Sequence, residues 1–197
     1  MSDDFKRVFS QLKKYGLLLQ TDAHLPNVCA LVAGSPVRGS WWAHPRSHDI
    51  FRVNSALADH HNVLIVKLIS GKVTYVERSL WSPVVTMARA REPWQLQGLS
   101  RAARELLDQI DRGPVETDRR LSKAATELEH SLLVASEQVH TAAGSHARRL
   151  ESWDHWLRRT GFADPKLNPD QARHLLEHAV ESLNHQFNAR GRLPWQS

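Results

Sequence analysis

The spacing of apolar residues predicts helices in the first third of the chain. Residues 3–15 place apolar side chains at intervals of three and four, which is the spacing of an amphipathic helix. Two further helices are predicted over 26–33, where Pro26 suits the first turn, and over 47–59. A short extended run over 17–20 separates the first helix from the second. This part of the chain is therefore predicted to be mainly helical.

Residues 62–78 carry the clearest β pattern in the chain. Two runs rich in Val, Ile and Tyr, over 62–69 and 72–78, flank the dipeptide Ser70-Gly71. Such runs around a short glycine turn predict a β-hairpin. Three helices followed by a hairpin is the element order of a winged helix, whose third helix and wing commonly meet a DNA duplex. We therefore predict a winged-helix-like N-terminal half.

The second half of the chain is predicted to be helical. A long helix is expected from about Thr117, because apolar residues from Leu121 to Ala142 are separated alternately by four and three positions. Other helices are predicted over 80–89, 100–112, 146–159 and from Pro169 onward. The fold class is therefore mainly α with one β-hairpin. A winged-helix-like region over 1–95 is expected to pack on a helical bundle over 96–197 as one compact unit.

The charges of the chain are concentrated in its middle. The 197 residues are 41% hydrophobic and 24% charged, as in ordinary soluble proteins, and the formal net charge is +5. Between Arg38 and Arg104, ten Lys and Arg residues stand against four Asp and Glu, so this segment alone carries +6. A basic stretch on a near-neutral remainder fits a surface that binds DNA, although a merely arginine-rich protein would give the same count.

Cysteine usage and hydropathy exclude several classes of protein. Cys29 is the only cysteine, so an intrachain disulfide and cysteine-based zinc sites are excluded, and we expect a buried apolar side chain. The first residues are charged, which does not fit a signal peptide, and no apolar run has the length of a membrane span. We therefore expect a cytoplasmic protein that binds DNA, with no cofactor, no membrane contact and no obligate protein partner.

Gln20 and Asp22 are the first candidates for catalysis. They are two residues apart at the end of the extended run, where both side chains would point to the same side. A carboxylate can stabilise the oxocarbenium-like sugar that forms when an N-glycosidic bond breaks, or activate the attacking water, while a neutral amide holds that water. The alternative, which the spacing alone favours, is that Asp22 caps the following turn and Gln20 is simply exposed.

Trp41, Trp42 and His44 form a second candidate group. Indole rings can stack on an extruded base or fill the gap that it leaves in the duplex. His44 can bind a phosphate or assist a leaving base, and Arg46 beside it is a candidate for DNA contact. At least one of the two tryptophans is expected to be a core residue instead. If this group belongs to the active site, Asp22 should border a pocket that it shares with the tryptophans.

The predicted hairpin carries basic residues suited to phosphate contacts, namely Lys67, Lys72 and Arg78, with Trp81 following them. A lysine close to an abasic sugar can also attack C1′ as a Schiff-base nucleophile. For Lys72 a solvated surface position is an equal alternative. We predict that these four residues belong to a DNA-binding surface.

Glu137 and His140 are three residues apart on the predicted long helix, and His146 follows shortly after. A glutamate and a histidine on one helix face can form an acid–base pair, or a metal site with His146 as the third ligand. A buried structural network is the alternative that the pattern favours, because this spacing is not a specific zinc signature. We predict Glu137 and His140 as catalytic candidates and assign no metal site.

Two of these segments resemble a known family. Leu18-Leu19-Gln20-Thr21-Asp22 and Trp42-Ala43-His44 are similar, in the same order, to the catalytic and Trp-Ala-His motifs of bacterial winged-helix DNA glycosylases, which excise alkylated bases and unhook interstrand crosslinks. The resemblance covers about the first 90 residues and implies that Gln20 and Asp22 position the attacking water. Thr21 departs from the apolar middle residue of the family's motif, the two motifs are closer together, and the chain is shorter than typical members. A looser resemblance, to compact anti-phage glycosylases that excise glucosylated hydroxymethylcytosine, bears only on the substrate.

We therefore predict a DNA glycosylase that hydrolyses the N-glycosidic bond of a modified base and leaves an abasic site, in DNA repair or antiviral defence. A non-catalytic winged-helix DNA-binding protein is the first alternative, and His48, Arg52 and Asn54 should then face the DNA groove. A metal-dependent hydrolase that uses Glu137 with the two histidines is the second alternative.

Overall fold

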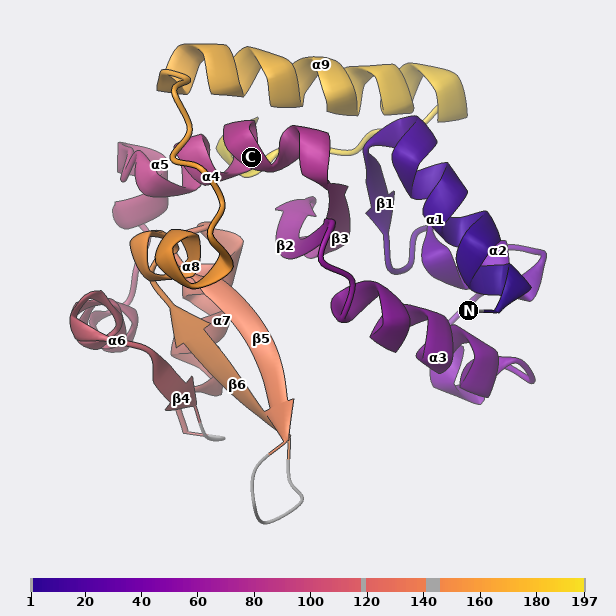
Figure 1. Cartoon of the computed structure of the whole chain (residues 1–197), viewed down its shortest axis with the longest axis horizontal. Helices are drawn as coiled ribbons and strands as arrows, with labels where there is room; N and C mark the ends of the chain where they lie inside the picture. Colours follow the sequence, from indigo (N-terminus) through magenta and orange to yellow (C-terminus); the bar gives the residue numbers. More distant parts are fainter. Residues whose placement is uncertain (1, 118–119, 141–145, 197) are drawn as a thin grey trace. The chain divides into compact units, whose positions relative to one another are not determined.

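The computed structural model describes residues 2–117, 120–140 and 146–196. These residues form nine α-helices and two three-stranded antiparallel sheets, so the fold is mixed α/β (Figure 1). The chain divides into two compact units: unit 1 is Met1–Trp81 with His174–Ser197, and unit 2 is Ser82–Arg173. The predicted functional division at residue 95 cuts the chain elsewhere and stays a prediction.

Unit 1 begins with three helices: α1 (Asp3–Tyr15), α2 (Val28–Ala33) and, after the 3-10 turn η1 (Trp41–Ala43), α3 (Ser47–Ala58). The helices predicted over 3–15 and 47–59 are confirmed, and Ser2 Oγ caps α1 by accepting from the Phe5 N–H. The second helix begins at Val28 rather than Pro26, because Asn27 Oδ1 accepts from the Ala30 N–H and caps it there.

The sheet of unit 1 has the strand order β1-β3-β2, with β1 (Leu17–Leu19), β2 (Val63–Ile69) and β3 (Lys72–Glu77). Strands β2 and β3 form the predicted hairpin, and both turn residues, Ser70 and Gly71, have positive φ. Strand β1 pairs antiparallel with β3, with Leu18 opposite Tyr75. This pairing brings the residues that follow β1 next to the first residue of β3.

One apolar core joins the three helices to the sheet in unit 1. It contains Leu12 of α1, Val28 of α2, Ile50 of α3 and Tyr75 of β3, each almost fully buried. Cys29 is fully buried in this core, as expected, and its burial raises the pKa of the thiol to about 11. The remaining elements of the unit are η2 (Arg78–Leu80), the part of α9 (Pro169–Phe187) from His174 onward, and η3 (Pro194–Gln196).

Unit 2 combines helices with a second sheet. Its helices are α4 (Trp81–Arg89) from Ser82 onward, α5 (Pro93–Leu96), α6 (Arg101–Arg112), α7 (Ser122–His130), α8 (Trp153–Thr160) and the start of α9. Its sheet has the strand order β4-β6-β5, with β4 (Val115–Thr117), β5 (Ala135–His140) and β6 (His146–Glu151). Helices α6 and α7 share a core with Leu150 of β6. Within the described ranges, no helix is both long and apolar enough to cross a bilayer.

The prediction of a purely helical second half is wrong. In place of the helix expected from Thr117 to Ala142, α7 ends at His130, Leu132 has a left-handed φ of 54°, and the chain then enters β5. The segment expected to be helical over 146–159 begins as β6. The four-three spacing matches the helix only as far as Leu128; further on, residues pair across β5 and β6, where Glu137 is opposite Arg149. Ala142 lies outside the described residues.

Candidate functional site

Asp22 and Lys72 form an ion pair in unit 1, although they are 50 positions apart in the sequence. The Lys72 Nζ lies 2.7 Å from the Asp22 Oδ2. The strand pairing explains this contact, because the Gln20 N–H still donates to the Val73 carbonyl and the chain leaves the sheet beside the start of β3. The Asp22 side chain is 12% exposed and that of Lys72 is 50% exposed, so the carboxylate is sheltered while the ammonium group remains open to solvent.

The other carboxylate oxygen of Asp22 organises the turn that follows. Its Oδ1 accepts from the backbone N–H groups of His24 and Leu25, each at 2.8 Å. This is the turn-capping role that the spacing favoured. The two oxygens therefore have different partners. Oδ1 accepts from backbone N–H groups, whereas Oδ2 has one partner within the described part of the chain, the half-exposed Lys72. A competing anion near Lys72 would release Oδ2.

The environment of Asp22 keeps its carboxyl group ionised. Burial raises the pKa of Asp22, but the hydrogen bond from Lys72 and those from the His24 and Leu25 N–H groups lower it by more, so the pKa lies below its ordinary value. A group whose folded pKa is lowered stabilises the fold above its unfolded pKa, and this stabilisation is lost as the pH falls through the folded pKa.

We therefore expect Asp22→Asn to destabilise the protein at neutral pH and to have a much smaller effect in acid. The asparagine keeps the turn cap but loses the ion pair with Lys72. Urea unfolding of both proteins at pH 7 and near pH 3 measures the two differences in the free energy of unfolding. An equal difference at the two pH values would show that the charge of Asp22 contributes nothing to stability.

A hollow of about 240 Å³ lies beside Asp22, entirely within unit 1. Its lining includes Gln11 and Tyr15 of α1, Asn27 before α2, and Phe187 at the end of α9. The Tyr15 and Phe187 rings meet edge to face with centroids 5.4 Å apart. The volume is below the roughly 300–1,000 Å³ of sites for drug-sized ligands, so the hollow suits one small planar group next to a carboxylate.

Gln20 lies apart from this hollow. Its carbonyl accepts from the Cys29 N–H, and its side chain hydrogen-bonds to Tyr75, whose hydroxyl donates to Asn54 Oδ1 at 2.7 Å. Gln20 is not among the described residues that line the hollow. The water-holding partnership predicted for Gln20 and Asp22 therefore has no geometric support in this structure, and Gln20 serves the buried network around Tyr75.

The two tryptophans lie on η1 and do not line the hollow beside Asp22, so this hollow is not the pocket that they are expected to share with Asp22. Their rings stack with centroids 3.9 Å apart. Trp41 is partly buried against the core, as expected for one of the pair, whereas Trp42 is 62% exposed. His44 follows them, and its Nδ1 accepts from the Arg46 N–H. The aromatic group and the Asp22 hollow are two separate features.

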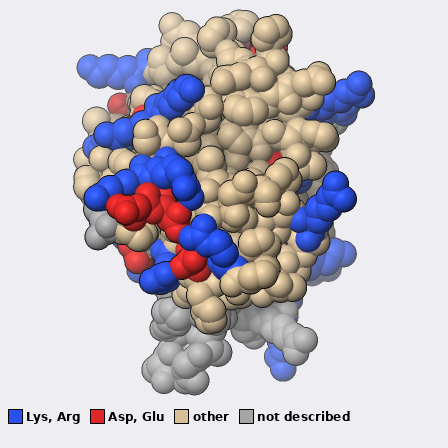
Figure 2. All heavy atoms as spheres, turned by 90° about the vertical axis from the view of Figure 1, so that its right-hand side faces the viewer, with Lys and Arg blue, Asp and Glu red and all other residues tan. Residues whose placement is uncertain are grey.

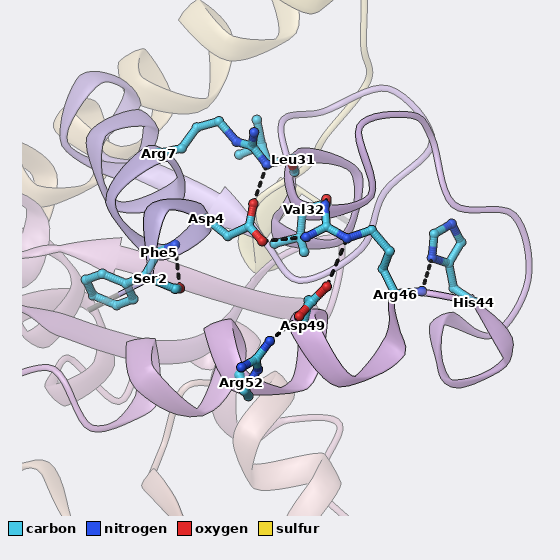
Figure 3. A network of polar contacts seen from close by, with 10 residues as sticks. All are labelled: Ser2, Asp4, Phe5, Arg7, Leu31, Val32, His44, Arg46, Asp49 and Arg52. Atoms are coloured by element: carbon cyan, nitrogen blue, oxygen red, sulfur yellow. Dashed lines mark hydrogen bonds and ion pairs between the residues drawn. The ribbon is translucent and has the colours of Figure 1, made fainter.

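Arg46 joins three helices through a polar network (Figure 3). Its guanidinium donates to Asp4 of α1 at 2.5 Å, to Asp49 of α3 at 3.0 Å and to the carbonyl of Val32 in α2. Arg7 and Arg52 complete the network by pairing with Asp4 and Asp49 respectively. Arg46 therefore links α1, α2 and α3 through its guanidinium group, which is a structural role. Its contact with DNA stays a prediction.

We expect Arg46→Met to lower the melting temperature clearly more than Arg52→Met does. Both substitutions remove a partner of Asp49, but only Arg46 also bonds Asp4 and the end of α2. Thermal unfolding followed by circular dichroism compares the two variants with the parent. Equal shifts in the two would show that the contacts of Arg46 with α1 and α2 do not contribute to stability.

The other predicted basic residues lie on or next to the hairpin. Lys67 is half-buried in β2, and Arg78 is exposed after β3 with its guanidinium 5.1 Å from the Trp81 ring centroid. Trp81 itself is buried, and its Nε1 donates to the Val76 carbonyl at 3.1 Å, so its side chain is a core residue and not part of an exposed DNA-binding surface. On the face that Figure 2 shows, Lys and Arg side chains lie in separate groups, one interleaved with Asp and Glu.

Glu137 lies on β5 of unit 2 rather than on a helix. Its side chain is 55% exposed, with its Oε2 3.7 Å from Arg159. The backbone of His140 pairs with that of His146 across the β5–β6 hairpin, but their side chains lie outside what the structure describes. Among the described residues, no three His, Cys, Asp or Glu side chains gather as a metal site. Catalysis by Glu137 and His140 stays a prediction.

Sequence reasoning missed the aromatic wall of the hollow and the exposure of Phe51. Tyr15 closes α1 and Phe187 closes α9, more than 170 positions later, so no local pattern connects them. The Phe51 ring lies 5.7 Å from the Trp42 ring. The sequence does contain a signal for this exposure, because Phe51 falls on the polar side of the helix that Ile50, Val53 and Leu57 predict.

Comparison with protein-family models, curated proteins and solved structures found no match for this chain, so the glycosylase resemblance stays an expectation.

Proposed function

We propose that this protein is a DNA glycosylase that hydrolyses the N-glycosidic bond of a modified base and leaves an abasic site. The observation that carries the proposal is the ion pair between Lys72 and Asp22, of which Asp22 lines the hollow. These two residues were predicted separately, one for catalysis and one for DNA contact. In the proposal, α1 to α3 and the β2–β3 hairpin act as a winged-helix-like DNA-binding region.

The resting ion pair provides a means of coupling DNA binding to catalysis. Lys72 is half-exposed, so its ammonium group can exchange the Asp22 carboxylate for a DNA phosphate. The exchange frees Oδ2, while Oδ1 remains fixed by the His24 and Leu25 N–H groups. The carboxylate then presents a negative charge at a defined place only when a phosphate is present.

The proposed reaction uses that charge. The base leaves with the bonding electron pair, and C1′ of the sugar acquires oxocarbenium character that the Asp22 carboxylate stabilises. Water adds to C1′ and loses a proton, which produces the abasic sugar and the protonated free base. The hollow lined by Tyr15 and Phe187 receives the extruded base, a group of the right size for its volume.

Counting abasic sites tests the proposal. The purified protein is incubated with unmodified DNA, with alkylated DNA and with phage DNA that carries glucosylated hydroxymethylcytosine, and abasic aldehydes are then labelled and quantified. We expect abasic sites in at least one modified DNA and background levels in unmodified DNA. Background levels in all three, with protein that is folded by circular dichroism, would contradict the proposal.

A non-catalytic DNA-binding protein is the second candidate, and the separation of the tryptophans from the hollow favours it. Part of its expectation is wrong, however, because Asn54 is 8% exposed and bonded to Tyr75, so it cannot read a DNA groove. His48 and Arg52 are exposed on α3. This candidate predicts DNA binding with no release of base, which the same incubation distinguishes.

A further inference from the structure

An exposed aromatic surface lies on η1 and the first half of α3. It consists of Trp41, Trp42 and Phe51, which we call the aromatic cluster. The Trp41 and Trp42 rings stack with an interplanar angle of 25°, and the Phe51 ring lies 5.7 Å from Trp42 at 38°. Trp42 is 62% exposed and Phe51 is 47% exposed. The inner ring is thus anchored, and the two outer rings face solvent.

This exposure is unusual for the described part of the molecule. Among its large hydrophobic side chains, only Leu175 of α9 is exposed to a similar degree. Isolated exposed apolar residues need no explanation, but Trp42 and Phe51 are neighbours with flat faces. Flat rings offer stacking surfaces for other flat rings. The aromatic cluster is separate from the hollow beside Asp22, since none of its residues lines that hollow.

The charges around the aromatic cluster favour an anionic partner. Residues 34–53 contain three arginines, Arg38, Arg46 and Arg52, and a single acidic residue, Asp49. Asp49 accepts from both Arg46 and Arg52, and Arg46 is also paired with Asp4 of α1, whereas Arg52 has Asp49 alone as its acidic partner among the ion pairs of the described residues and remains 71% exposed. A partner that combines negative charge with flat rings is a nucleic acid. In a duplex the faces of the bases are already stacked, so the rings available to Trp42 are those of an unpaired strand.

We propose that the aromatic cluster binds single-stranded DNA by stacking unpaired bases on Trp42 and Phe51, with the exposed Arg52 at the phosphates. This inference goes beyond the proposed excision reaction and does not require it. A protein without glycosylase activity would still bind the strand here. A strand held at this surface would have its bases unstacked from their neighbours.

Fluorescence anisotropy with a labelled, unmodified oligothymidylate tests the proposal, because this probe contains no base to excise. Stacking contributes about 1–3 kcal/mol per base, so we expect Trp42→Ala to weaken binding roughly five- to 150-fold and Phe51→Ala to weaken it less. Trp42→Phe should retain most of the affinity. Leu175→Ala is the matched control, because its side chain is as exposed as Phe51 but lies outside the aromatic cluster, and it should bind like the parent.

A second probe makes the test independent of any variant's folding. An oligomer of abasic residues has the same phosphates without the bases, and the parent protein should bind it at least as weakly as Trp42→Ala binds oligothymidylate, because Phe51 also loses its stacked base. Equal affinity of the parent for the two probes would overturn the proposal, since binding would then be purely electrostatic. Failure of the parent to bind oligothymidylate would also overturn it. So would a finding by sedimentation that Trp42→Ala only converts a dimer of the protein to a monomer and leaves the affinity for oligothymidylate unchanged.

Failure of strand binding at the aromatic cluster can be told apart from failure of the proposed glycosylase reaction. In an Asp22→Asn background, Trp42→Ala should weaken oligothymidylate binding by the same factor as it does in the parent, because the two residues belong to separate features. Loss of base release without loss of oligothymidylate binding would leave the aromatic cluster as a strand-binding site on a protein of another activity. Loss of oligothymidylate binding with base release intact would remove the aromatic cluster and leave the Asp22 site.

Discussion

Replacing Asp22 with asparagine is expected to lower the rate of base release by about 10²- to 10⁴-fold, the range for a positioned catalytic group. Asparagine has the shape of aspartate and can keep the turn closed by accepting from the His24 and Leu25 N–H groups. It lacks the negative charge that stabilises the oxocarbenium-like sugar. Single-turnover release of base from the modified DNA measures the effect.

Two matched variants define what that result means. Asp59→Asn changes an exposed aspartate at the end of α3 and should leave the rate unchanged. Lys72→Met leaves the Asp22 charge but removes the group proposed to exchange between carboxylate and phosphate, and should mainly weaken DNA binding. An Asp22→Asn rate within threefold of the parent would remove Asp22 from the mechanism.

Arg159→Met is expected to destabilise the protein by about 3 kcal/mol, the largest loss of stability that we predict. Glu151 is buried, with its side chain 4% exposed, and Arg159 donates to both of its oxygens at 2.5–3.3 Å. Removing the guanidinium leaves a buried carboxylate without its partner. The expected loss is at the lower end of the range for a broken buried pair, because the Arg159 side chain is 38% exposed and water can enter.

The double variant Arg159→Met with Glu151→Gln separates the lost attraction from the cost of an unpaired charge. We expect it to be more stable than Arg159→Met alone, because the amide needs no counter-charge. Urea unfolding of the four proteins completes the cycle. A double variant less stable than Arg159→Met would show that Glu151 has compensating interactions of its own.

The elements predicted correctly are those that short-range patterns specify. The helix over 3–15 has its cap, its apolar stripe and its terminating Gly16 within one continuous segment, and the β2–β3 hairpin has its turn at Ser70-Gly71. The second half shows the limit of this reasoning. The spacing from Leu121 to Leu128 does belong to a helix, but a left-handed residue at Leu132 and strand pairing beyond it replace the continuation that the spacing predicts.

The candidate site could be predicted only residue by residue. Asp22 was identified from its position after a short strand, and Lys72 from its position at the start of a hairpin. Their contact depends on the pairing of β1 with β3, which joins segments 50 or more residues apart. Asn54 is buried and Gln20 does not line the hollow for the same reason. Both side chains bond Tyr75, and the core around Tyr75 exists only when the sheet and the helices have assembled.

Mass spectrometry of the products that the protein releases from modified DNA, together with a measurement of the length of the remaining strand, is the most direct test for glycosylase activity. We expect the free modified base in solution and an uncut strand that carries an abasic site, with both formed about 10²- to 10⁴-fold more slowly when Asp22→Asn replaces the parent. Release of a nucleotide or nucleoside, or recovery of unchanged DNA from folded parent protein, would contradict this expectation.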